Sequence, residues 1–139
     1  MDDSAEIRIL LDARKLGDGG IGVYIENLVD GLLKLEDKGR AKPRISLLLP
    51  PEFFEDSTLS THFKTNGQGA LMRSCQLRWL GRVRFIADRS PKYSLREFFL
   101  MGYCQKQECK EHDIFHSPHF TLPYFLGLPA VVTIHDMIS

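Results

Sequence analysis

The sequence lacks several features that would assign it to a special class of protein. Its 139 residues have no surplus charge, because 18 basic residues balance 18 acidic ones, so no global field attracts nucleic acid. No run approaches the roughly 20 apolar residues that cross a bilayer. The acidic start, "MDDSAEIR", contains no apolar segment of a signal sequence. We therefore expect a cytoplasmic protein that binds no nucleic acid.

Cysteine is scarce, and its spacing argues against a metal site. Cys75, Cys104 and Cys109 are odd in number and form no C-x-x-C pair, which favours reduced and buried thiols. The spacing His116-x-x-His119 is the only other pattern that suggests a metal. A loop pair of histidines without acidic or thiolate partners is more often structural, so we expect no metal site and no cofactor.

Apolar runs and periodicity predict alternating strands and helices. The run Ile7 to Leu11 is typical of a strand buried on both faces of a parallel sheet, and Ile45 to Leu49 gives a second such strand that ends at two prolines. Between them, apolar residues recur at the three- and four-residue spacing of an amphipathic helix, at Ile21, Ile25, Leu28, Val29, Leu32 and Leu33. The order so far is strand, helix, strand.

The second half continues this alternation after a long polar connection over residues 52–70, in which Phe53 and Phe54 suggest a helical turn. Residues 83–87 predict a short or edge strand, and a capping box of Ser94 and Glu97 begins a helix expected from about Leu95 to about Lys110. Two further strands are expected at 114–116 and 130–134. The fold class is therefore α/β: one Rossmann-like domain over residues 1–139, with a parallel sheet flanked by helices.

Three glycines stand where the first strand passes into the helix. In an open α/β sheet, ligands bind outside the carboxyl ends of the strands, and a helix N-terminus there favours an anionic group. Gly19, Gly20 and Gly22 would let such a group approach the main chain; the alternative is a tight strand-to-helix turn with close packing. The spacing is not G-x-G-x-x-G, since Ile25 occupies the third position, which disfavours a nicotinamide dehydrogenase.

Histidines follow the last two expected strands. "IFHSPHF" and "VVTIHD" each end a strand with histidine and small polar residues, so three strand ends should meet at one edge. A histidine that ends a strand has a purely structural alternative, a hydrogen bond to a loop carbonyl. This alternative applies directly to His135.

Three separated motifs, "GGIGVYIENL", "DIFHSPHFTLP" and "PAVVTIHDMI", together resemble the N-terminal domain of GT-B glycosyltransferases. The resemblance is closest to the retaining, nucleotide-sugar-dependent family that includes bacterial polysaccharide and lipopolysaccharide mannosyltransferases. It implies that Gly20, Ile21 and Gly22 contact the donor diphosphate and the acceptor, with Gly19 as a supporting hinge. It also implies catalytic roles for His135 and Asp136, and places His116 and Ser117 on the wall of the cleft that binds the donor and the acceptor.

The resemblance implies a hexosyltransferase that moves a sugar such as mannose from a nucleotide sugar to a glycan or lipid-linked acceptor, without a divalent metal. Enzymes of this fold have a second nucleotide-binding domain, whereas this sequence ends at Ser139. We therefore expect a truncated domain that is inactive alone. The alternative is a non-catalytic α/β module that binds a phosphate-bearing ligand or a protein partner.

A local basic and aromatic stretch lies between Met72 and Arg96. Arg78, Trp79, Arg82 and Arg84 could contact an anionic lipid surface or a lipid-diphosphate acceptor, which would place the protein peripherally at the inner membrane face. The alternative is an ordinary solvated face.

Overall fold

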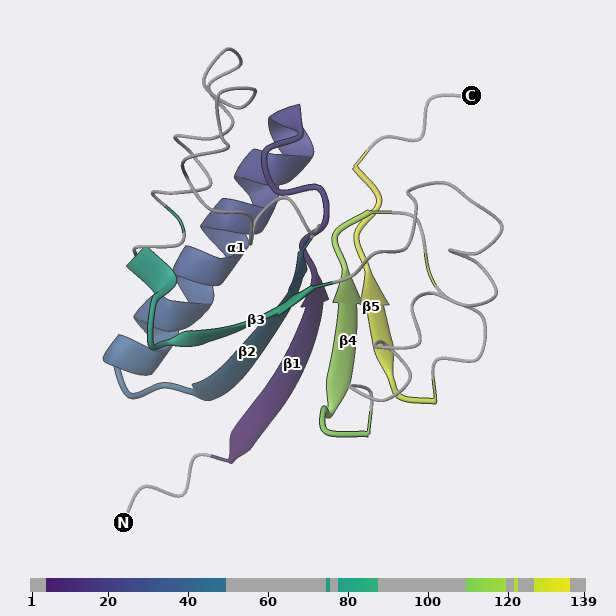
Figure 1. The fold of residues 1–139 in the computed structure, drawn as a ribbon. Helices are drawn as coiled ribbons and strands as arrows, with labels where there is room; N and C mark the ends of the chain where they lie inside the picture. Colours follow the sequence, from purple (N-terminus) through teal and green to yellow (C-terminus); the bar gives the residue numbers. More distant parts are fainter. Residues whose placement is uncertain are drawn as a thin grey trace.

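The computed structural model describes residues 5–49, 75, 78–87, 110–119, 122 and 127–135. In this part of the chain, five strands form one sheet in the order β3-β2-β1-β4-β5, and every pair is parallel (Figure 1). The elements are β1 (Glu6–Asp12), α1 (Gly19–Asp37), β2 (Lys42–Leu49), β3 (Val83–Ala87), β4 (Ile114–Ser117) and β5 (Ala130–Val132).

The central strand β1 is buried on both faces of the sheet. Its successive residues Leu10 and Leu11 are 0% and 1% exposed and belong to separate hydrophobic clusters, because neighbouring side chains of a strand point to opposite faces. Leu11 lies beside Leu47 of β2 and His116 of β4. The apolar run at the start of the sequence is thus the middle of a parallel sheet, as predicted.

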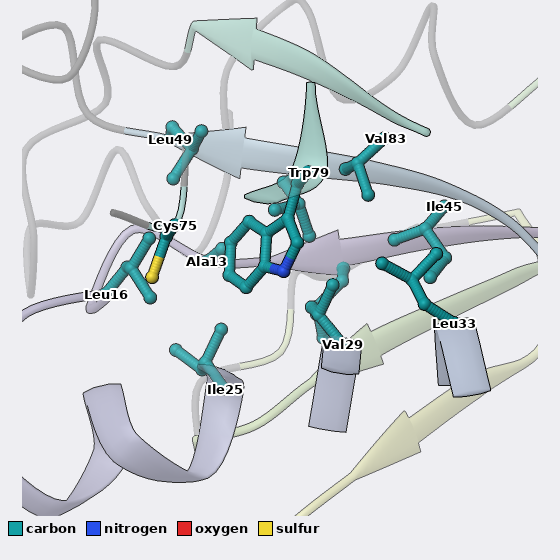
Figure 2. Close-up of a cluster of buried hydrophobic side chains, with 12 residues drawn as sticks. Ala13, Leu16, Ile25, Val29, Leu33, Ile45, Leu49, Cys75, Trp79 and Val83 are labelled. Atoms are coloured by element: carbon teal, nitrogen blue, oxygen red, sulfur yellow. The ribbon is translucent and has the colours of Figure 1, made fainter. Parts of the chain in front are cut away.

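Helix α1 covers one face of the sheet, and Trp79 fills the space between them. The helix contributes Ile25, Val29 and Leu33, whose spacing of four residues places them on one side of α1. The Trp79 indole is fully buried, and its Nε1 donates to Asp30 of α1 at 2.8 Å. Figure 2 shows the indole among Ala13, Leu16, Ile25, Val29, Leu33, Ile45, Leu49, Cys75 and Val83. The opposite face buries a smaller cluster of Leu10, Leu48, Ile86 and Phe115.

The chain changes direction across the sheet between β3 and β4. It passes outward from β1 through β2 to β3, and then returns to place β4 on the other side of β1. The position between β1 and β4 is therefore a topological switch point, where open α/β sheets bind ligands at the carboxyl ends of the strands. The strand order is that of Rossmann-like folds, and the predicted parallel α/β class is confirmed.

Several predicted bounds differ from the observed ones. β3 is the edge strand that its pattern suggested, β4 extends to Ser117, and β5 ends at Val132 rather than at residue 134. The expected turn at Phe53 and Phe54, the capping box, and all but the last residue of the helix from about Leu95 to Lys110 lie outside the described residues. In the part that is described, no helix has the length and apolar character needed to cross a membrane.

Arg8 and Asp113 join β1 to the start of β4 at the amino end of the sheet. The guanidinium of Arg8 donates to Oδ1 of Asp113 at 2.9 Å, and the Arg8 backbone N–H donates to Oδ2 at 2.8 Å. These hydrogen bonds to the charged carboxylate hold the pKa of Asp113 down at about 2. The ion pair is exposed, so its contribution to stability depends on salt as well as on pH.

Replacement of Trp79 tests whether the indole supports the core. We expect Trp79→Ala to lower the free energy of unfolding by about 3–5 kcal/mol, because it removes a large buried side chain and the hydrogen bond from the indole to Asp30. Leu80→Ala, at the neighbouring 68% exposed position, should change it by less than about 0.5 kcal/mol. Urea unfolding of both variants measures the difference, and equal small effects would contradict the assignment of Trp79 to the core.

Asp113→Asn should make the chain less stable than the wild type at neutral pH, because it removes the charge that pairs with Arg8. The folded pKa lies below the ordinary value of 3.8, so the Asp113 contribution is fully present above that value and is lost as the pH falls towards about 2. Thermal unfolding from pH 6 to 2 should show that the difference in melting temperature between the two proteins decreases below pH 4. A difference that stays constant over this pH range would contradict this account.

Candidate functional site

The candidate site lies at the carboxyl edge of the sheet, on both sides of the switch point. It combines the turn from β1 into α1, the loop that follows β4, and residues 133–135 after β5. Because these strands are parallel, their carboxyl ends emerge together beside the start of α1 (Figure 1). The expected convergence of the glycine turn and the two histidine segments is therefore present.

Gly22 has a structural role within the turn. A Cβ at this position would lie 2.6 Å from the backbone nitrogen of Gly17, which is too close for any side chain. Gly17 itself has a φ of 94°, in the region that favours glycine. The turn after β1 folds directly onto the first turn of α1, so close packing explains Gly22 without a ligand. This observation matches the alternative interpretation of the glycine cluster.

Gly20 differs from Gly22 because no described residue requires its missing side chain. A Cβ there would meet no atom of the described part of the chain within 4 Å, and its φ is not in the positive region. Gly19 is equally open but has a φ of 52°, which explains the glycine. Ile21 is half-buried against the main core cluster, so its side chain supports α1. Gly20 is thus the position of the turn at which a ligand could approach the backbone closely.

Charged groups near this helix terminus have both signs. Asp18 occupies the N-cap without a capping hydrogen bond from its side chain, and no acidic residue follows in the first turn of α1. Asp12 and Arg14 form a buried ion pair just before the turn, with Arg14 Nε 2.8 Å from Oδ1 and its terminal nitrogen 2.7 Å from Oδ2. These two hydrogen bonds fix the backbone at the end of β1. The sequence analysis did not predict this ion pair.

Polar side chains at the end of β4 hold the loop that follows this strand and the segment after β5. Ser117 is fully buried, and its hydroxyl donates to the carbonyl of His119. His116 Nε2 lies 3.0 Å from Oγ1 of Thr133, and burial lowers the pKa of His116, so its imidazole is neutral at pH 7. Ser117 supports the loop, whereas His116 lies at the edge itself.

His135 is exposed and is anchored through one ring nitrogen. Its Nε2 lies 2.6 Å from the carbonyl oxygen of Pro118, which accepts only, so Nε2 carries the proton. The Tyr24 ring meets the imidazole edge-on, with centroids 4.8 Å apart. This is the loop-carbonyl bond of the structural alternative, and it leaves Nδ1 as the acceptor of the neutral ring. Asp136 lies outside the described residues.

The edge contains three further polar residues that sequence reasoning did not single out. Lys15 Nζ lies 2.7 Å from Nε2 of His119, which links the turn after β1 to the loop after β4 across the switch point. Thr133 Oγ1 lies 3.0 Å from the hydroxyl of Tyr24. Tyr24 follows Gly20 by four residues and therefore shares its face of α1, a helical spacing that could have pointed to it.

Within the described residues 78–87, the basic stretch is not a patch of unpaired positive charge with a surface aromatic residue. Trp79 is buried in the core, contrary to the expectation of a surface aromatic. The three arginines each lie within 3.3 Å of acidic side chains: Arg78 of Glu26 and Asp30, Arg82 of Glu36 and Asp37, and Arg84 of Glu111. These carboxylates lie outside the stretch from Met72 to Arg96, so the local excess of positive charge in the sequence did not reveal them. Membrane or acceptor contact through this stretch stays a prediction with reduced support.

Cys75 and the histidines offer neither a thiolate nor a metal centre in the described part of the chain. Cys75 is buried and free, and loss of solvation raises the pKa of its thiol to about 11, which makes it a poor nucleophile. His116 and His119 contact different partners, Thr133 and Lys15. No group of three or more metal-ligating side chains gathers among the described residues.

Comparisons with known proteins found no match to this chain among family models, curated proteins or solved structures.

Alanine at the two glycines should have opposite effects on stability. Gly22→Ala should lower the free energy of unfolding by about 1–3 kcal/mol, since its Cβ forces the Gly17 backbone to move. Gly20→Ala should raise it by about 0.4–1 kcal/mol, because the position is open and alanine restricts the unfolded chain. Urea unfolding compares both variants with the wild type. Destabilisation by Gly20→Ala as large as that by Gly22→Ala would contradict this division of roles.

Proposed function

We propose that this domain is the acceptor-facing, diphosphate-contacting part of a retaining glycosyltransferase that moves a hexose, such as mannose, from a nucleotide sugar to a glycan or lipid-linked acceptor. The observation that carries the proposal is the convergence at one switch-point edge of the three segments in which the sequence resembles that family. The type of reaction is inferred from the resemblance. The fold supports the proposal because open α/β sheets bind ligands at this edge.

The edge offers groups that suit each part of a nucleotide sugar. Transfer develops negative charge on the departing phosphate, and the start of α1 beside Gly20 presents backbone N–H groups and a favourable dipole to such a charge. His135 donates through Nε2 to Pro118, so its neutral ring has Nδ1 left to accept a hydrogen bond from a sugar hydroxyl. Neither contribution requires a metal.

A second candidate function is a non-catalytic module that binds a phosphate-bearing ligand. The observation in its favour is that Ser117 and His135 both hydrogen-bond to carbonyls of the loop after β4. These side chains therefore have a role in shaping the edge that does not depend on catalysis. The two functions share the start of α1 but differ at His135. Binding of a diphosphate alone does not require that imidazole, whereas sugar transfer does.

Binding at the start of α1 is tested with a matched pair of variants. Gly20→Val and Gly31→Val introduce the same branched side chain on α1 at positions where a Cβ meets nothing within 4 Å. Only the first lies at the carboxyl edge, so it should weaken binding of GDP, UDP and pyrophosphate about tenfold or more. Calorimetry on the folded proteins measures this, and equal affinities in both variants would contradict a site at Gly20.

Transfer is tested with radiolabelled nucleotide sugars and lipid-linked acceptors. We expect no turnover by this chain alone, since loss of one well-placed donor already costs about 10²–10³ in rate. A second nucleotide-binding domain, fused or in trans, should restore turnover, and His135→Ala should then reduce it with little loss of stability. Binding without turnover in the completed protein would favour the module, and indifference to His135→Ala would remove this residue from the site.

A further inference from the structure

Tyr24, Thr133 and His116 form a continuous chain of hydrogen-bonding groups across the carboxyl edge. The Tyr24 hydroxyl of α1 lies 3.0 Å from Thr133 Oγ1, and the same oxygen lies 3.0 Å from His116 Nε2 of β4. Thr133 follows β5, and its backbone N–H donates to the carbonyl of Ser117 at 2.9 Å, which holds the hydroxyl in place. Three separate elements thus meet at one oxygen atom.

The chemistry of the three groups favours one direction for the hydrogen bonds. Thr133 has a single hydroxyl proton, so it can donate to only one of its two neighbours. A phenol, with a pKa near 10, is a better donor than an aliphatic hydroxyl, and a neutral imidazole nitrogen is the best acceptor of the three. The strongest arrangement therefore places the best donor, Tyr24, at one end and the best acceptor, His116, at the other, where the two bonds polarise each other.

We propose that Tyr24 is a positioning residue that fixes the tautomer of His116 through Thr133, opposite to the tautomer that Pro118 fixes at His135. Its hydroxyl donates to Thr133, which donates to His116 Nε2, so neutral His116 carries its proton on Nδ1. Its ring packs edge-on against His135, whose Nε2 carries the proton for Pro118. Neither histidine is then free to exchange its donor and acceptor nitrogens.

Protonation of His116 reverses its hydrogen bond to Thr133. Protonated His116 has a donor at both nitrogens, so Nε2–H must donate to Thr133, and the added proton comes from solvent. Thr133 Oγ1 has two lone pairs and can accept from His116 and Tyr24 together, so its own proton no longer points to the imidazole. The other charged or titratable groups described at this edge are Asp12, Arg14, Lys15, Asp18, His119 and His135.

The tautomers can be read directly from long-range ¹H–¹⁵N spectra of the imidazoles, without a ligand. In the wild type at pH 8 we expect the proton on Nδ1 of His116 and on Nε2 of His135. Thr133→Val keeps the side-chain shape but removes the donor, so His116 should move towards the Nε2–H form. Thr133→Ser retains the hydroxyl and should preserve the wild-type tautomers.

Tyr24→Phe tests the far end of the chain. It retains the ring, so His135 should be unchanged, while the loss of the phenol should shift the pKa of His116 less than Thr133→Val does. Because both effects pass through Thr133, the double variant should titrate like Thr133→Val alone. Val23→Ala, at the exposed neighbouring position, should leave both histidines as in the wild type.

Two results would overturn the proposal. One is a wild-type His116 with its proton on Nε2, which would reverse the direction of the chain. The other is an additive effect of Tyr24→Phe and Thr133→Val on the His116 pKa, which would show that Tyr24 acts independently of Thr133. The proposal concerns the same edge as the proposed function but uses no nucleotide, so failure of either leaves the other to its own test.

Discussion

The parallel pairing of β1 with both of its neighbours is the constraint on which the rest of the structure depends. β1 lies in the middle of the sheet, with β2 on one side and β4 on the other. These two neighbours come from the first and the second half of the sequence. This pairing creates the switch point and brings the carboxyl ends of β1, β4 and β5 to one edge. Lys15 and His119, 104 positions apart in sequence, can meet only because of it.

The same constraint explains the tight turn after β1. The chain leaves the sheet at Asp12 and must begin α1 on the face that buries Ile25 and Val29. The turn achieves this by packing Gly17 against Gly22 so closely that no Cβ fits. The buried pair of Asp12 and Arg14 fixes the departure from the sheet. A glycine cluster at this place is therefore partly a requirement of the fold, and only Gly20 is left without such a reason.

The sequence predicts the strands well because their burial is encoded locally. Continuous apolar runs identify β1 and β2, and the alternation in residues 83–87 identifies an edge strand. Interactions between distant segments are not encoded in this way. Trp79 was placed on the surface because its neighbours are basic, yet Glu26 and Asp30 of α1 neutralise Arg78 and Asp30 accepts from the indole. Likewise, no local pattern pairs Tyr24 with Thr133, which lies 109 positions away.

Most of the polar groups at the carboxyl edge already satisfy one another, and this limits what a ligand can use. The Ser117 hydroxyl donates to a loop carbonyl, and Lys15 contacts His119. His116 contacts the hydroxyl of Thr133. A ligand that displaced these bonds would first have to match them, because a buried polar group left unpaired costs about 1–3 kcal/mol. Groups that can form a further hydrogen bond are better suited to bind a ligand. They are the open backbone at Gly20, Nδ1 of His135, and the lone pairs of the Tyr24 hydroxyl. All three lie at the start of α1 or against its first two turns, so a ligand at this edge is expected to follow α1 rather than the loop after β4.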